Sequence, residues 1–136
     1  MTAVELMRLC RNAFEVERVD GEFTLEGGRV SPGFSPGNGE WVAIRGSRWN
    51  DGVHKVEDGD LPDTVDETFR GTVWVLRPPM DFLRLCRRID RYQQRGEPEA
   101  ERERFGEYEV SGRKSWQQVF AGELAPWRRM FTEVPL

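Results

Sequence analysis

The segment at residues 68–76, TFRGTVWVL, constrains the fold most strongly, because it carries apolar side chains on both faces of a strand. Successive side chains of a strand point to opposite faces, so Val73 and Val75 lie opposite Trp74 and Leu76. A strand that is apolar on both faces must be covered on both faces. We therefore expect this strand to lie in the centre of a sheet or beneath a helix.

The first helix is predicted from its start signal. Thr2 and Glu5 have the spacing of a capping box, in which two side chains satisfy free backbone N–H groups at a helix start. The apolar residues that follow recur at helical spacing and predict a helix over residues 3–13. They are Leu6, Leu9, Cys10 and Ala13.

Two further helices are predicted after the apolar strand. Pro78-Pro79 stops the strand and starts a helix over residues 78–96, which ends near Gly96. Residues 97–113 are expected to form a charged loop and a short strand, FGEYEV. A last helix over residues 114–125 is expected to end or kink at Pro126. Its apolar residues at helical spacing are Trp116, Val119, Phe120 and Leu124, and Trp116, Phe120 and Leu124 are expected to form its packing face.

Residues 14–77 have the alternation and turn signals of a compact antiparallel β unit of about five strands. Asp20-Gly21 predicts a tight hairpin turn, and Asn50-Asp51-Gly52 predicts a second reversal. The Gly- and Pro-rich segment SPGFSPGNGE, residues 31–40, predicts a loop. The fold class is therefore predicted to be α+β, in a single domain of 136 residues that ends in an extended arm over residues 126–136.

Charge and hydropathy disfavour some classes of function. The chain has 20 Lys and Arg residues against 24 Asp and Glu, a formal net charge of −4, which disfavours a protein that mainly coats nucleic acid. The N-terminus has no basic region followed by an apolar stretch, and no run approaches the length of a membrane span. We expect a soluble protein that is made in the cytoplasm.

The residues that commonly carry chemistry do not converge in the sequence. His54 is the only histidine, and on a strand it would lie apart from the acidic turn, so a packing role is favoured over a catalytic one. The acidic run from Asp58 to Glu67 lacks the ligand spacing of a calcium loop. Cys10 and Cys86 fall on apolar helix faces and are expected to be buried thiols. We therefore predict no catalytic residue, no metal and no cofactor.

Two surfaces are candidates for contacts with other molecules. The second helix carries arginines on one exposed flank, which fits a plain solvated face and also contact with DNA phosphates or an acidic partner. The tail beyond Pro126 is apolar and aromatic, so it either packs on its own domain or docks onto a partner. The arginines are Arg84, Arg87, Arg88, Arg91 and Arg95, and the tail residues are Trp127, Arg128, Arg129, Met130, Phe131, Val134 and Leu136.

The order of these segments resembles the small head-tail connector (adaptor) proteins of tailed bacteriophages and prophages. In the first part of the chain, the resemblance is carried by LMRLCRNAF, GEFTLEGGRV, WVAIRGSRWNDGVHKV and LPDTVDETFRGTVWVLRPP. In the last part, FGEYEVSGRKSWQQVFAGELAPWRRM is similar to the aromatic-Gly-x-Tyr segment, the Trp-containing helix and the Trp/Tyr-Arg-Arg/Lys-Met/Ile ending of that group. The resemblance covers nearly the whole chain.

The resemblance implies a non-enzymatic component of the virion neck. Such a protein would form a homo-oligomeric, dodecameric ring beneath the portal protein, contact stopper or tail proteins, and leave a channel through which phage DNA passes. Residues Trp127 to Leu136 would dock onto the portal, and no membrane contact is expected. Two alternatives stay open: a stopper or tail-completion protein of the same region, and a small host β module that binds a peptide or nucleic acid.

Overall fold

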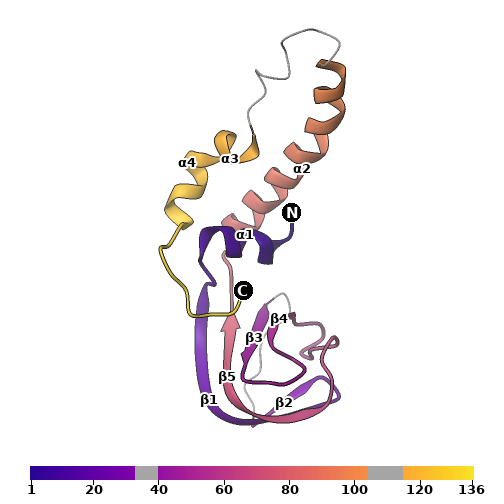
Figure 1. Ribbon diagram of the computed structural model, residues 1–136, viewed down its shortest axis with the longest axis vertical. Helices are drawn as coiled ribbons and strands as arrows, with labels where there is room; N and C mark the ends of the chain where they lie inside the picture. Colours follow the sequence, from indigo (N-terminus) through magenta and orange to yellow (C-terminus); the bar gives the residue numbers. More distant parts are fainter. Residues whose placement is uncertain (33–39, 104–114) are drawn as a thin grey trace.

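The computed structural model describes residues 1–32, 40–103 and 115–136. It confirms the predicted α+β class, with an antiparallel sheet at one end of the molecule and helices at the other (Figure 1). The strands are β1 (Glu15–Glu26), β2 (Arg29–Ser31), β3 (Trp41–Arg45), β4 (Gly52–Lys55) and β5 (Glu67–Leu76). The helices are α1 (Ala3–Cys10), α2 (Met80–Glu103), α3 (Trp116–Val119) and α4 (Ala121–Leu124).

The strand β5 occupies the central position that its two apolar faces predict. The five strands have the order β2-β1-β5-β3-β4, so β5 pairs with β1 on one side and with β3 on the other. Trp74 and Leu76 join a core that includes Phe82 of α2, whereas Val73 joins a second core with Phe23 of β1. One face of the curled sheet therefore joins the core of the helices at the end of β5, and the other face has its own apolar core.

The predicted hairpin turn at Asp20-Gly21 is wrong. The strand β1 runs through both residues and remains paired with β5, with Gly21 opposite Gly71. The hairpin turn lies instead at Gly27-Gly28, where φ is 60° and 82°, between β1 and β2. The pairing with β5 extends over ten residue pairs, and this long-range ladder outweighs the local turn preference of Asp-Gly.

The second predicted reversal is confirmed. The chain turns through residues 46–51, and β3 and β4 then pair antiparallel with Ile44 opposite Gly52. Val42 lies opposite His54 in the same ladder, which places the histidine in the sheet. Most of the predicted loop at residues 31–40 lies outside the described part of the chain.

Helices α1 and α2 begin close to the predicted positions and end elsewhere. The capping box of Thr2 and Glu5 is present, but α1 ends at Cys10 because Arg11 adopts the left-handed conformation, with φ 52°. α2 continues past Gly96 to Glu103, so the predicted end near Gly96 is wrong. Residues 97–103 contain four Glu, one Ala and one Arg, which are good helix formers, and the helix continues through Pro98 without an apolar stripe. The predicted strand FGEYEV lies outside the described residues.

The predicted last helix is divided into two short helices. α3 and α4 are separated at Phe120, whose φ of −99° and ψ of 10° interrupt the helical backbone. Pro126 lies in a 3₁₀ turn over Ala125–Trp127, which confirms the predicted end of the helix. Phe120 and Leu124 are buried and Trp116 packs against the same core, whereas Val119 is exposed. Among the described residues, no helix is both long enough and apolar enough to cross a bilayer.

Candidate interaction surfaces

The C-terminal arm, residues 126–136, packs back onto its own domain. It runs from α4 past α1 to the sheet (Figure 1). The side-chain amide of Asn12 donates to the Trp127 carbonyl at 2.9 Å, and the Arg129 N–H donates to the Cys10 carbonyl at 2.8 Å. These two bonds fix the arm to the end of α1. Of the two possibilities left by the sequence, the structure therefore has the tail folded back.

Three apolar side chains of the arm pack in or against the apolar core, and Trp127 and Val134 are its main anchors. The Trp127 ring meets Phe14 and Phe82 edge-on, with ring centroids 5.6 Å apart in both pairs. Val134 is 4% exposed and belongs to the apolar core that the helices share with the end of the sheet. Leu136 is partly buried against the same core. Trp127, Val134 and Leu136 from the predicted docking set thus have a structural role within the chain.

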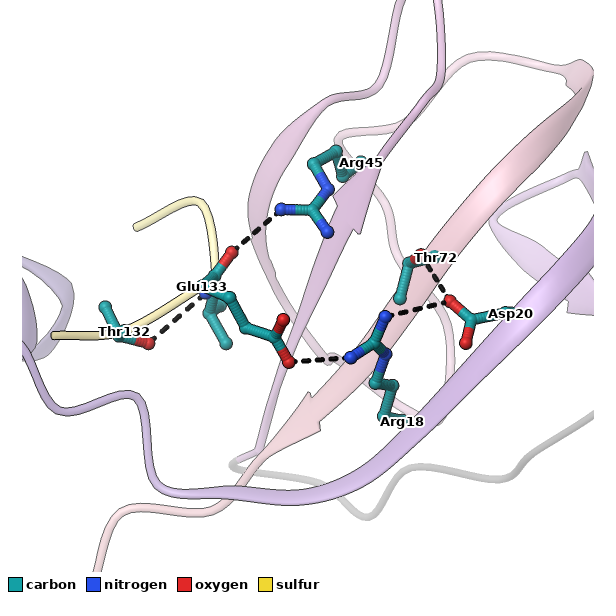
Figure 2. Close-up of polar contacts among 7 residues, drawn as sticks. Arg18, Asp20, Arg45, Thr72, Thr132 and Glu133 are labelled. Carbon is teal, nitrogen blue, oxygen red and sulfur yellow. Dashed lines mark hydrogen bonds and ion pairs between the residues drawn. The ribbon is translucent and has the colours of Figure 1, made fainter.

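Glu133 ties the arm to the sheet through polar contacts (Figure 2). Its carboxylate accepts a hydrogen bond from Arg18 of β1 at 2.7 Å, and its backbone carbonyl accepts one from Arg45 of β3 at 3.0 Å. Arg45 also lies 4.9 Å above the Trp74 ring, a cation–π geometry. Next to this contact, the Thr72 hydroxyl donates to Asp20 at 2.5 Å and, as the main cause, lowers the pKa of that carboxyl.

Between these anchors, the arm presents two apolar side chains to solvent. Met130 is 91% exposed and Phe131 is 76% exposed. Arg11 holds this stretch by donating to the Met130 carbonyl at 3.1 Å. A shallow groove of about 390 Å³ lies between the arm and α1. Its lining residues are Arg8, Arg11, Met130, Phe131, Thr132, Val134 and Leu136.

A second surface is built by the loop between β3 and β4. The Glu67 carboxylate of β5 accepts hydrogen bonds from the Ser47 hydroxyl, from the Arg48 N–H at 2.7 Å and from the Asn50 amide at 2.8 Å. These bonds lower the pKa of Glu67, and the bond from Ser47 contributes most. The loop is thereby fixed while Trp49 remains 66% exposed, with the Arg48 guanidinium 4.9 Å from its ring.

His54 lies beneath this loop and has a packing role. It is 8% exposed, its Nε2 lies 2.6 Å from the Asn50 carbonyl, and its Nδ1 lies 3.2 Å from Asp63. Its ring nitrogens are therefore used to hold the loop and the β4–β5 connection together. In the described part of the chain, no three His, Cys, Asp or Glu side chains are grouped as ligands for a metal ion.

The arginines of α2 form a third surface. Arg84, Arg87, Arg88, Arg91 and Arg95 are all exposed, as predicted. Arg88 donates two hydrogen bonds to the Glu123 carboxylate of α4, one of which is 2.9 Å long. Arg84 lies 3.6 Å from Asp81. An open hollow of about 560 Å³ lies on this side of the helix. Its lining residues are Arg84, Arg87, Arg88, Asp90 and Arg91.

Sequence reasoning missed the Trp49 loop as a surface. Asn50-Asp51-Gly52 predicts a turn that sets the register of the strands, and no spacing in the sequence links Ser47 with Glu67 or singles out Trp49. Glu67 follows Ser47 by 20 residues, so no local spacing reveals their hydrogen bond. An exposed tryptophan beside a polar turn was the one available signal, because large aromatic side chains in loops are common anchors at interfaces.

Comparison with models of protein families, with curated proteins and with solved structures found no match for this chain. The likeness to head-tail connectors therefore rests on the residues that carry it.

Proposed function

We propose that the protein is a structural subunit of the neck of a tailed phage, a head-tail connector that forms a ring and binds the portal through its C-terminal arm. The proposal combines the sequence resemblance with one structural observation. The arm is anchored at Trp127 and Val134, and between these anchors it presents Met130 and Phe131 to solvent. In this role the chain is not an enzyme, and it acts in the virion by joining surfaces.

The geometry of the arm suits a docking element. Exposed apolar side chains lose hydration when a partner covers them, and fixing them beforehand lowers the entropy cost of binding. Met130 and Phe131 lie on backbone that is held by Arg11 and by the Arg129–Cys10 bond. The adjacent arginines Arg8 and Arg11 add positive charge to this surface, which favours an acidic surface on the partner.

Copurification with the portal protein of the same phage or prophage genome tests this function. The chain with Met130→Ser and Phe131→Ser should lose retention on the tagged portal by about tenfold or more, because the docking contact is removed. These side chains are exposed, so the fold should be preserved. Removal of residues 127–136 is a poorer test, since it also removes Trp127 and Val134 from the core.

Val16→Ser with Val119→Ser is the matched control, because both residues are exposed and apolar and lie outside the arm. This control should bind the portal as the unmodified chain does. If the unmodified chain is not retained on the portal, or if the Met130 and Phe131 variant is retained equally well, the assignment of the arm to portal binding is wrong.

A further inference from the structure

One surface of the chain combines an exposed tryptophan with negative charge. We call it the Trp49 face and define it by the exposed residues Arg48, Trp49, Asp51, Asp63, Val65 and Asp66. Three carboxylates against one guanidinium give this face a formal charge of −2. The hydrogen bonds of Asn50 to Val65 and of His54 to Asp63 hold its parts in one arrangement.

A different surface of the same chain has the opposite charge. The hollow on α2 is lined by four arginines and one carboxylate, that of Asp90. Asp90 is itself in contact with the Met1 amino group at 2.7 Å. Its lining side chains have a formal charge of +3, and the total is +2 when the groups that pair with them are included, Asp81, Glu123 and the Met1 amino group. The hollow lies on a helix that extends away from the sheet end (Figure 1).

We propose that the Trp49 face of one copy docks into the arginine hollow of the next copy. The charges are complementary, and guanidinium groups that line a hollow are suitable partners for an indole ring through cation–π contact. Because the two surfaces are different, the contact is heterologous and repeats from copy to copy, as a ring requires. This inference deepens the proposed function and rests on it, since it supplies the subunit contact of the ring.

The Trp49 face is suited to this role by its rigidity. The Glu67 carboxylate accepts hydrogen bonds from Arg48 and Asn50 and so fixes the loop that carries Trp49. The Trp49 backbone therefore loses little conformational freedom when a partner covers the side chain. The second copy is favoured over DNA as the occupant of the hollow, because the chain has a formal charge of −4 and itself carries an exposed acidic surface that matches the hollow.

Charge reversal with mixing of variants tests the contact. Self-association of the full chain is measured by sedimentation over a range of protein and salt concentrations. Reversal of the hollow by Arg87→Glu with Arg91→Glu, and reversal of the face by Asp63→Lys with Asp66→Lys, should each weaken association by at least about tenfold. The unmodified chain should associate, and added salt should weaken the association.

An equal mixture of the two reversed variants is the decisive measurement. In the mixture, the acidic hollow of one variant meets the basic face of the other, so association should return. A matched control is Glu15→Lys with Glu17→Lys, which changes the same number of exposed acids on β1 and should associate as the unmodified chain does. Trp49→Ala should weaken association by about tenfold without loss of the fold, because the side chain is mostly exposed.

The proposal is overturned if the unmodified chain stays monomeric at all concentrations, if the Arg87 and Arg91 variant associates normally, or if the mixture remains monomeric. Unchanged association together with lost binding to duplex DNA in the Arg87 and Arg91 variant would assign the hollow to phosphates instead. Normal association by a chain that does not bind the portal would uphold this contact and remove the proposed function, so the two failures are distinguishable.

Discussion

The side-chain amide of Asn50 pairs with the backbone of Val65 at both of its ends. Its nitrogen donates to the Val65 carbonyl at 3.0 Å, and its oxygen accepts from the Val65 N–H at 2.8 Å. Asn50 is 2% exposed. Its side-chain amide pairs with Val65 as the backbone of a neighbouring strand would. The Asn50 side chain therefore joins the loop between β3 and β4, which carries Trp49, to the connection between β4 and β5.

Asn50→Ala should lower the free energy of unfolding by about 1–3 kcal/mol, because the Val65 N–H and carbonyl lose their partner in a partly buried place. Chemical denaturation measures the change. Gln117→Ala is the control, since Gln117 is exposed on α3, and it should change stability by less than about 0.5 kcal/mol. Equal stabilities of the two variants would show that the Asn50 contacts contribute little.

The pH dependence of stability should contain a contribution from Glu67. The hydrogen bond from Ser47 and the other donors lower its pKa in the folded state. A carboxyl whose pKa is lowered by folding stabilises the protein above its unfolded pKa, about 4.3, and this contribution is lost as the pH falls through the folded pKa. Unfolding free energy measured from neutral pH to about pH 3 should therefore decrease less steeply in Glu67→Gln and in Ser47→Ala. Gln117→Ala changes no titratable group and should keep the steepness of the unmodified chain.

Gly71→Ala should be severely destabilising. A Cβ atom at Gly71 would lie 2.0 Å from the Arg45 carbonyl oxygen, and both groups belong to the sheet backbone. We expect a loss of about 3 kcal/mol or more, or failure to fold, as measured by thermal or chemical unfolding. Gly122→Ala in α4 meets no atom within 4 Å and should be neutral or stabilising by up to about 1 kcal/mol. A stable, unchanged Gly71→Ala protein would contradict the close approach of β3 and β5.

Two contacts of the arm, the packing of the Trp127 ring and the ion pair of Glu133, should contribute differently to the free energy of unfolding. Trp127→Ala removes a ring that packs against Phe14 and Phe82 and should cost about 3 kcal/mol. Glu133→Ala removes an exposed ion pair with Arg18 and should cost less than about 1 kcal/mol. Denaturant titration of both variants checks the order. A larger loss for Glu133→Ala would mean that polar contacts, and not ring packing, hold the arm.

The two thiols should be unreactive in the folded protein. Cys10 and Cys86 are buried as predicted, and burial raises the pKa of both thiols. Since the thiolate is the reactive form, an aromatic disulfide reagent should react with them slowly in buffer and rapidly after unfolding in denaturant. Gln117→Cys provides an exposed thiol that should react at once. Rapid reaction of the unmodified native chain would contradict the burial of both thiols.

The sequence by itself determined the features that depend on neighbouring residues. The capping box at Thr2, the helix start after Pro78-Pro79, the reversal at Asn50-Asp51-Gly52 and the central place of β5 all follow from local spacing, and all are present. The arginine stripe of α2 and the burial of both cysteines follow from helical periodicity in the same way.

Only the tertiary structure decided the features that depend on distant residues. Asp20-Gly21 remains extended because β1 pairs with β5 over ten residue pairs, which a local turn preference cannot reveal. Glu67 reaches the Ser47 loop, and the arm reaches Cys10 across more than a hundred residues. Those partners are brought together by the packing of the sheet and helices, so the surface that displays Trp49 and the outward direction of Met130 and Phe131 emerge only in the folded chain.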